Sequence, residues 1–504
     1  MDPVNVTKSI LHLIAGYITL PLVASLCCVY LLHSFVNSKR RRLPPGPIGL
    51  PIVGYIPFLP TSYGDKLTSL FHKYGDIFSL TLGSTDVVFL ADYDLIKQSL
   101  LKDVFNHRPS FSFFSSVLPS SLANWNGDEW KEQRKFSVRV LKQLGIGKQV
   151  VEERILDEID VLMDKFRQEN EAPVEVLQLI GASISNVINL LIMGERFDYD
   201  HPTRVMIDKA FLTREKTPSI LGTLNYIPTI AKILHYIPFT PIGNVVVRMD
   251  NVMRYLRNRI RELRSSFNVQ DGDAICFIEA YLKEMAVNET GVYFDDMHMI
   301  GNAFTFFAAA STTTGDFLAW FLLYMVTFPD VQQKMRKEVD EVLGTNRVSG
   351  HMKQNMPYTE ALMQELHRHV SAAPIGLIHA VAEDVDLGDY LLPAGTHVVI
   401  GIFQVHNNPT FFPQPEKFDP ERFISKEGTF IRDEHVIPFG SGRRSCPGEP
   451  IANMEVFLYI VSFIQAFLIE SPKGRKYTTA GVMEFIARNP KDAPVEVVFK
   501  QRRR

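Results

Sequence analysis

The stretch Phe439-Gly440-Ser441-Gly442-Arg443-Arg444-Ser445-Cys446-Pro447-Gly448 decides the fold of this 504-residue chain. Its glycines allow a tight backbone turn, and its cysteine comes just before a long apolar segment, 449–466, that has the period of a helix. The dipole at the start of a helix favours a thiolate, and a thiolate is a ligand of haem iron. The stretch therefore predicts an iron ligand at Cys446, with a buried structural cysteine as the simpler alternative.

Motifs upstream of this stretch support the first interpretation. Glu365 and Arg368 lie three residues apart on a helix predicted over 359–370, and Arg422 follows within Phe-Asp-Pro-Glu-Arg-Phe at 418–423. Trp130 and Arg134 lie four apart on a helix predicted to begin near residue 128. Each pattern alone also fits an ordinary amphipathic helix. Together and in this order they resemble the cytochrome P450 family, over about nine-tenths of the chain.

The resemblance implies a set of roles around haem b, whose iron Cys446 would ligate axially. Trp130, Arg134, His379 and Arg444 would contact the haem propionates, and Phe439 and Gly448 would complete the loop beneath the haem. Glu365, Arg368 and Arg422 would form a buried ionic network that holds this loop. For His379 the alternative is a structural role, which an isolated histidine in an apolar stretch has more often.

A second helix, predicted over 295–327, resembles the one that crosses the oxygen-binding side of the haem. Ala309 matches the family pattern, and Thr313 matches its hydroxyl beside the oxygen site. Thr312, however, replaces the acid that normally supplies protons through water. Asp316, one turn further on, is a hypothetical substitute, and an acid facing solvent is the equally good alternative.

The substrate pocket predicted from the resemblance is apolar. It includes Phe113, Phe114, Ala309 and Ile375, although aromatic clusters of this kind more often form ordinary core. The segment 226–239 is apolar and interrupted by prolines, which suits contact with a membrane surface.

The N-terminus predicts a membrane anchor. Residues 10–33 are apolar and long enough to cross a bilayer, and the basic residues 39–42 that follow indicate a cytoplasmic side. A cleaved signal peptide would place its positive charge before the apolar segment. We expect an anchor at 1–36, a basic and proline-rich linker at 37–48, and a catalytic domain at 49–504 on the cytoplasmic face of the endoplasmic reticulum.

Composition limits the classes of partner. The formal net charge is -3, with 53 basic and 56 acidic residues, so no strong positive field would draw nucleic acid. Four cysteines, two of them inside the apolar N-terminal segment, do not suggest a disulfide framework.

No nicotinamide or flavin fingerprint occurs, so electrons must come from another protein. The resemblance implies NADPH-cytochrome P450 reductase, with cytochrome b5 as a second donor, and basic residues that could dock them are Lys131, Arg134, Lys135 and Arg443.

The fold class follows from the period of the sequence and from the resemblance. Helices are predicted over 149–167, 246–264, 295–327, 329–343 and 449–466, a hairpin over 77–91, and short strands over 397–403 and 495–499. We therefore expect a mainly α chain with a small β-rich region, in a P450-like fold that holds haem between the distal helix and the cysteine loop.

The predicted activity is that of a haem-thiolate monooxygenase acting on a lipophilic substrate. One alternative is a peroxide isomerase or dehydratase of the same fold, which would need neither reductase nor proton relay. The altered residues Ala310 and Thr312 favour this alternative somewhat. The other alternative is a haem-binding protein without turnover.

Overall fold

Helices are the main regular elements of the computed structural model. It describes residues 25, 29, 42–60, 63–109, 120–144, 149–211, 226–227, 233, 237, 240–268, 272–288, 291–484 and 487–502. The helices are α2 (Gly64–Tyr74), α3 (Tyr93–Leu100), α5 (Gly127–Gln143), α6 (Gln149–Gln168), α7 (Val176–Met193), α8 (Pro202–Phe211), α11 (Pro241–Ser266), α12 (Phe277–Val287), α13 (Asp296–Thr327), α14 (Pro329–Leu343), α15 (Pro357–Val370), α16 (Ile402–His406) and α17 (Glu449–Ala466).

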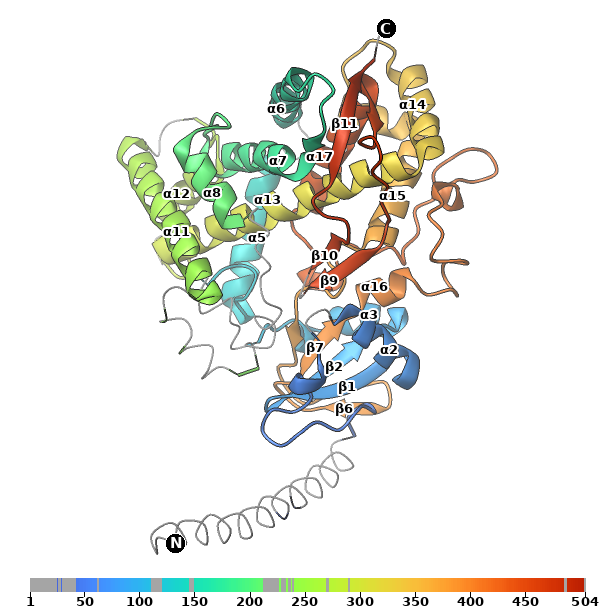
Figure 1. The fold of residues 1–504 in the computed structure, drawn as a ribbon. Helices are drawn as coiled ribbons and strands as arrows, with labels where there is room; N and C mark the ends of the chain where they lie inside the picture. The colour runs from blue at the N-terminus through green and yellow to red at the C-terminus, as the bar shows by residue number, and fades with distance from the viewer. Residues whose placement is uncertain are drawn as a thin grey trace, which may run out of the picture.

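The strands form small sheets. The largest has the order β1-β2-β7-β4, and it contains β1 (Ile77–Leu82), β2 (Thr85–Leu90), β4 (His379–Ala380) and β7 (His397–Ile400). A second joins β3 (Val174–Glu175), β11 (Glu496–Gln501) and β8 (Phe467–Glu470). Two hairpins pair β5 (Val385–Leu387) with β6 (Tyr390–Leu392), and β9 (Gly481–Glu484) with β10 (Ala487–Pro490). The strands β1, β2, β6 and β7 lie together at one end of the molecule, whereas β11 lies at the other (Figure 1).

Local chemistry fixes the ends of the helices that carry the site. The Asp295 carboxylate accepts a hydrogen bond from the His298 N–H at 2.9 Å and so caps α13. α14 and α15 each begin with a proline, whose missing N–H costs nothing in the first turn of a helix. α7 ends at Gly194, which takes a left-handed conformation with φ 73°.

The long helix α13 runs through the middle of the helical part and packs against α7, α11 and α17 (Figure 1). A Cβ on Gly315 would lie 3.4 Å from the Gly181 Cα of α7, so the absence of a side chain allows the two helices to approach closely. Among the described residues, α7 and α13 are long and apolar enough to cross a membrane. Both are mostly buried inside the protein, which is typical of core helices.

The structure confirms the hairpin, with Leu82 paired to Thr85, and the five long helices to within a few residues. The strand predicted over 397–403 is partly wrong, because β7 ends at Ile400 and the chain turns into α16. The last strand is Glu496–Gln501 rather than 495–499. The predicted anchor, Phe113, Phe114 and most of 226–239 lie outside the described residues.

Candidate active site

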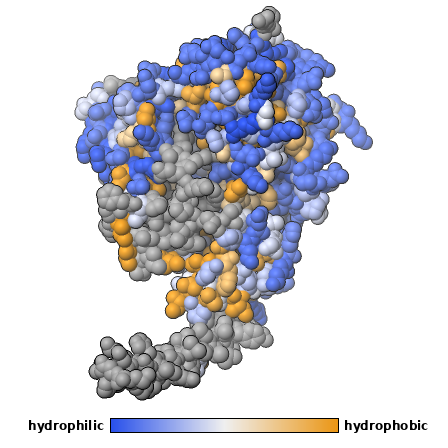
Figure 2. Space-filling model, in the orientation of Figure 1, coloured by the Kyte–Doolittle hydropathy of each residue, from blue (hydrophilic) through white to orange (hydrophobic). Residues whose placement is uncertain are grey.

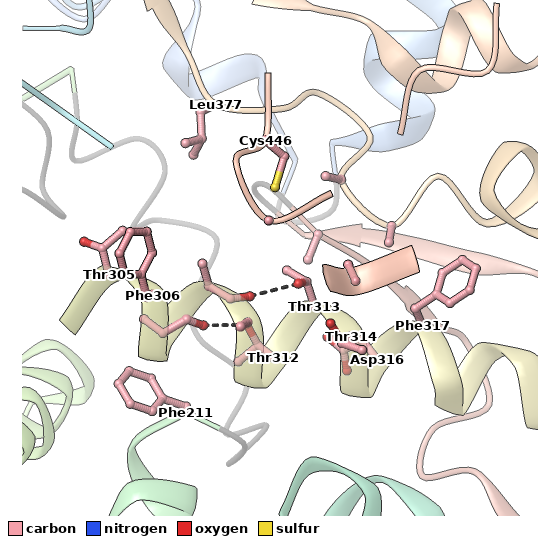
Figure 3. A pocket seen from close by; sticks show the side chains of 18 of the residues that line it. Phe211, Thr305, Phe306, Thr312, Thr313, Thr314, Asp316, Phe317, Leu377 and Cys446 are labelled. Carbon is pink, nitrogen blue, oxygen red and sulfur yellow. Dashed lines mark hydrogen bonds between the residues drawn. The ribbon is translucent and has the colours of Figure 1, made fainter. Parts of the chain in front are cut away.

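A cavity of about 1840 Å³ lies between α13 and the loop that carries Cys446. Ala309, Thr312 and Thr313 line it from α13, and the Cys446 sulfur points toward this helix from across the cavity (Figure 3). Phe439 and Gly448 line it on the cysteine side. The threonine motif of α13 and the cysteine loop, which are remote in the sequence, therefore meet at one site.

The loop around Cys446 is a tight turn. The Cys446 N–H donates to the Phe439 carbonyl at 2.9 Å, and Gly440 and Gly442 both have positive φ, of 75° and 71°. Gly442 is required twice over, because a Cβ there would lie 2.4 Å from the Leu100 carbonyl oxygen.

The Cys446 side chain is open to the cavity but is otherwise surrounded by protein. Burial raises the pKa of its thiol, and the N–H groups at the start of α17 and the nearby Arg134 lower that pKa only in part. The helix start therefore acts in the expected direction but is the weaker effect. A bound metal cation would add the missing stabilisation of the thiolate.

Three arginines point into the same region and have no acidic partner among the residues that the structure describes. Arg444 lies 3.8 Å from the centre of the Trp130 ring, Arg134 donates to the Ser445 carbonyl at 2.7 Å, and Arg108 donates to the Leu377 carbonyl at 2.8 Å. Within the described part of the chain, no carboxylate forms a salt bridge with any of the three, and the Arg108 Nε and Trp130 Nε1 atoms are buried without a hydrogen-bond partner.

The electrostatics of this cluster indicate a missing anion. Burial, followed by repulsion from the other arginines, lowers the pKa of Arg444 to about 8 and that of Arg108 to about 10. A buried group of like charges is stable only with a counter-charge. A ligand with two carboxylates that enters the cavity beside Cys446 would supply that charge, and the propionates of haem fit this requirement.

His379 lies at the rim of the same cluster. Its Nδ1 donates to the Phe105 carbonyl at 2.9 Å, and its side chain is buried against the cavity. Burial and then the charge on Arg108 hold its pKa well below the ordinary value, so the ring is neutral in the protein alone.

Behind the cysteine loop, Glu365 lies completely buried between two arginines. Its carboxylate accepts from Arg368 at 2.7 and 2.8 Å and from Arg422 at 3.1 Å. Arg368 also donates to the carbonyls of His406 and Pro415, each at 2.9 Å. The network therefore ties α15 to the segment that leads into the cysteine loop.

On α13 the two threonine hydroxyls are engaged with their own helix. Thr312 donates to the Ala308 carbonyl at 3.0 Å and Thr313 to the Ala309 carbonyl at 2.8 Å (Figure 3). Asp316 lines the same cavity one turn further along.

The structure places one predicted pocket residue and one predicted docking cation elsewhere than the sequence suggested. Ile375 is buried in the apolar cluster around β1 and β2 rather than in the cavity wall, because Gly376 turns the chain with φ 56° and presents Leu377 and Ile378 instead. Arg134 points inward to Ser445, whereas Lys135 is exposed.

The comparisons with known proteins agree with this geometry. The sequence model of the family described as Cytochrome P450 matches residues 44–495. Cytochrome P450 2H2 of Gallus gallus is 31% identical over 473 residues, which cover 91% of this chain and 94% of the relative. Cytochrome P450 18a1 of Drosophila melanogaster is 31% identical over 482 residues (92% and 88%), and cytochrome P450 2U1 of Homo sapiens is 32% identical over 481 residues (88% and 87%).

The chain belongs to the cytochrome P450 family. It is accordingly a monooxygenase of the oxidoreductase class, and family membership implies haem held by a cysteine thiolate. That group fits the cavity, the cysteine that opens into it and the three arginines, which form no salt bridge within the described part of the chain.

Two residues of this P450 site did not emerge from the sequence. Arg108 lies on a loop with no local motif, so only the fold reveals that it joins Arg134 and Arg444. Glu455 lines the cavity from α17, where it is completely buried. An acid in the interior of a mostly apolar helix was a visible signal for Glu455.

Proposed function

We propose that this P450 binds haem b through Cys446 and inserts one atom of dioxygen into a lipophilic substrate, using electrons that NADPH supplies through a separate reductase. The observation that carries the proposal is the Cys446 sulfur facing Thr313 across a largely apolar cavity. Haem, when bound, would supply the electron transfer and the cleavage of the O–O bond.

The residues of the chain would hold and orient that group. Arg108, Arg134 and Arg444 would pair with its two carboxylates, and the N–H of Trp130 would gain the partner that it lacks in the protein alone. His379 would close the same side, and Phe439 and Gly448 would support the loop beneath the ring. Glu365, Arg368 and Arg422 would fix the position of the loop.

Protons would reach the oxygen site from α13. Thr313 would hold the last hydroxyl, Thr312 would hold water where the family has an acid, and Asp316 would supply the charge one turn away. The release of peroxide per NADPH consumed, measured in Asp316→Asn and Thr312→Glu, tests these assignments. Peroxide release that stays unchanged in both variants would remove Asp316 from the mechanism.

The chain would work at the membrane of the endoplasmic reticulum, with residues 1–36 as anchor, 37–48 as linker and 49–504 as the catalytic domain. Figure 2 shows apolar residues gathered at the β-rich end of the molecule, where Ile48, Leu50, Ile52 and Phe58 are exposed. Such a surface suits contact with lipid. Lipophilic substrates would then enter from the bilayer, past Phe113 and Phe114, to Ala309 on α13.

The reduced carbon monoxide spectrum of the purified protein tests the ligand. A thiolate-ligated haem gives a strongly red-shifted band, and Cys446→His should lose it while Cys276→Ser, a change at a buried cysteine in another part of the fold, should keep it. Persistence of the band in Cys446→His would refute the ligand assignment.

Consumption of NADPH in the presence of reductase, stimulated by a lipophilic compound, tests the activity. Conversion of a hydroperoxide without NADPH, in the absence of that consumption, would favour the isomerase or dehydratase instead.

A further inference from the structure

An ion pair on α8 lines the cavity and has no role in the haem site. Arg204 and Asp208 lie one turn apart on this helix, and the Arg204 Nη2 and Asp208 Oδ2 atoms are 2.6 Å apart. Arg204 is 6% exposed, and both residues line the same cavity as Cys446 and Thr313. The cavity therefore carries a second group of buried charges, on a different helix from those that hold the arginines beside the cysteine loop.

The ion pair leaves hydrogen-bonding capacity unused on both partners. The Arg204 Nε atom donates to the Tyr199 carbonyl at 2.9 Å and Nη2 contacts Asp208, but the buried Nη1 atom has no hydrogen-bond partner among the described residues. The Asp208 Oδ1 atom is likewise buried without a partner in this part of the chain. A buried ion pair is tolerated when its remaining donors and acceptors are satisfied, so the two unpartnered atoms indicate a ligand.

Both partners keep their charges at neutral pH. Burial raises the pKa of Asp208 to about 6, and the charge on Arg204 lowers that pKa only in part. Asp208 is therefore still a carboxylate near pH 7, and its Oδ1 atom can accept a hydrogen bond but cannot donate one.

The rest of this end of the cavity is apolar. α8 packs against α7, α11 and α13, and apolar side chains of all three helices line the cavity: Ile188, Leu191, Val245, Met249, Phe304 and Ala308. In Figure 3, Phe211 of α8 lies on the opposite side of α13 from Cys446, so α8 lines the end of the cavity away from the cysteine. The volume of about 1840 Å³ exceeds the roughly 300–1,000 Å³ of most ligand sites and leaves room for haem and a large substrate.

The two unpartnered atoms select the chemical class of the ligand. An alcohol group can accept a hydrogen bond from Arg204 Nη1 and donate one to Asp208 Oδ1 at the same time. A carboxylate would face the negative charge of Asp208, and an ammonium group would face the positive charge of Arg204. A pure hydrocarbon would leave both atoms without a partner.

We propose that Arg204 and Asp208 bind the alcohol group of a long lipophilic substrate at the α8 end of the cavity, and so direct the other end of that substrate toward Cys446. The pair then determines specificity and orientation and takes no part in the chemistry. This inference rests on the proposed function, because it names the substrate class of the same site.

Equilibrium dialysis of radiolabelled ligands with the full-length holoenzyme in detergent tests the site without turnover. Dodecanol and tridecane are the probes, since they have the same number of non-hydrogen atoms and differ in the alcohol group. Cells that hold detergent alone correct for partitioning. Hydrogen bonds to charged groups are each worth roughly tenfold to a hundredfold in affinity, so we expect dodecanol to bind at least about tenfold more tightly. Equal affinities, or no saturable binding of dodecanol, would overturn the proposal.

Replacing the ion pair by apolar residues of similar size, in Arg204→Met with Asp208→Leu, should remove this preference. Such a replacement of a buried ion pair is often neutral or stabilising, so the variant should fold and keep its melting temperature. The control is Arg139→Met with Glu284→Leu, which removes another ion pair of 2.6 Å, between α5 and α12, and should keep the preference. A preference for dodecanol that persists without Arg204 and Asp208 would overturn the assignment.

Asp208→Asn tests the charge at the site. Dodecanoate should bind the unaltered enzyme less tightly than dodecanol does, because its carboxylate meets that of Asp208. The substitution removes this repulsion, so we expect dodecanoate to bind severalfold more tightly in the variant. Dodecanoate that binds the unaltered enzyme more tightly than dodecanol would overturn the choice of an alcohol in favour of an anion.

The position of oxidation separates this proposal from the proposed function. With NADPH and reductase, dodecanol should be oxidised mainly at carbons far from its alcohol group, and Arg204→Met with Asp208→Leu should spread the oxidation along the chain. Absence of the carbon monoxide band, or of NADPH consumption, in the unaltered enzyme would remove the proposed function, while dialysis would still decide whether the alcohol binds. Oxidation mainly beside the alcohol group, with the band and NADPH consumption intact, would overturn only the orientation proposed for the substrate.

Discussion

At the scale of single residues, Glu365 is the carboxylate whose removal should cost most. Arg368 is 0% exposed, so Glu365→Ala would leave a buried guanidinium without its counter-charge, at about 3–5 kcal/mol. We expect the free energy of unfolding in urea to fall by this amount, and the haem content to fall with it. Glu421→Gln is the control, because Glu421 pairs with Lys334 on the surface and should change stability by less than about 1 kcal/mol. Equal urea midpoints for the two variants would contradict the bracing role of Glu365.

For Glu455, in contrast to Glu365, we expect the ionised carboxyl group to lower the stability of the protein. Burial raises its pKa from 4.5 to about 8, so the folded protein holds a proton that the unfolded chain has lost. The stability present below the lower pKa is therefore lost as pH rises toward the higher one, by a few kcal/mol between about pH 5 and pH 8. Glu455→Gln should remove this part of the slope. Urea unfolding of both proteins across this pH range measures it, and Glu169→Gln, an exposed site, should keep the slope.

At the scale of elements, the position of α13 depends on Gly301. A Cβ there would lie 2.0 Å from the Ser120 carbonyl oxygen, in the segment before α5, whose Leu122 N–H donates to Asn302 at 3.0 Å. Alanine would gain up to about 1 kcal/mol of helix propensity, but overpacking against backbone costs about 1–3 kcal/mol.

Gly301→Ala is therefore expected to lower the melting temperature and to weaken haem binding, because α5 carries Trp130 and Arg134. Gly315→Ala on the same helix is the matched change, since its Cβ would meet Gly181 only at 3.4 Å. A melting temperature for Gly301→Ala at or above that of Gly315→Ala would show that the segment before α5 moves away freely.

The elements also show which parts of the fold the sequence could predict. α14 and α17 were predicted at their observed bounds, because a proline opens each and apolar residues recur at a helical period. α7 was missed, since a helix that is buried on nearly every side shows no polar face. The strand after residue 397 was extended too far, because nothing in its composition distinguishes β7 from the α16 turn that follows.

At the candidate site, the sequence predicted the residues that belong to recognisable motifs. It missed residues whose role depends on their surroundings in the folded protein. The resemblance to the family implied that Cys446 and Thr313 lie at one site, and both line the same cavity. Arg108 gains its character from desolvation and from Arg134, which is remote in the motif pattern, and no local pattern encodes either property. Glu455 gains its raised pKa from burial, and the acid inside a mostly apolar helix was its one local signal. Arg134 shows the same limit of sequence-based prediction. The sequence of α5 predicts a basic face that includes Arg134, but this side chain points into the protein and donates to the Ser445 carbonyl.

At the scale of the whole molecule, the exposed cations of α5 predict how a reductase would approach. Lys131 and Lys135 are exposed on the side of α5 that faces away from the cavity. Arg443, in the cysteine loop, forms a salt bridge with Asp103. Complementary charges raise the rate of encounter, and salt screens them over about 10 Å at 0.1 M.

We therefore expect Lys131→Glu and Lys135→Glu to slow the reduction of the enzyme by the reductase, severalfold at low salt and much less at high salt. Reduction by dithionite, which needs no docking, should be unchanged. Lys337→Glu on α14 is the control, because this lysine is exposed on another helix. Stopped-flow reduction with reductase at several salt concentrations measures the effect. An equal effect of all three substitutions would show that net charge, rather than this face, governs the encounter.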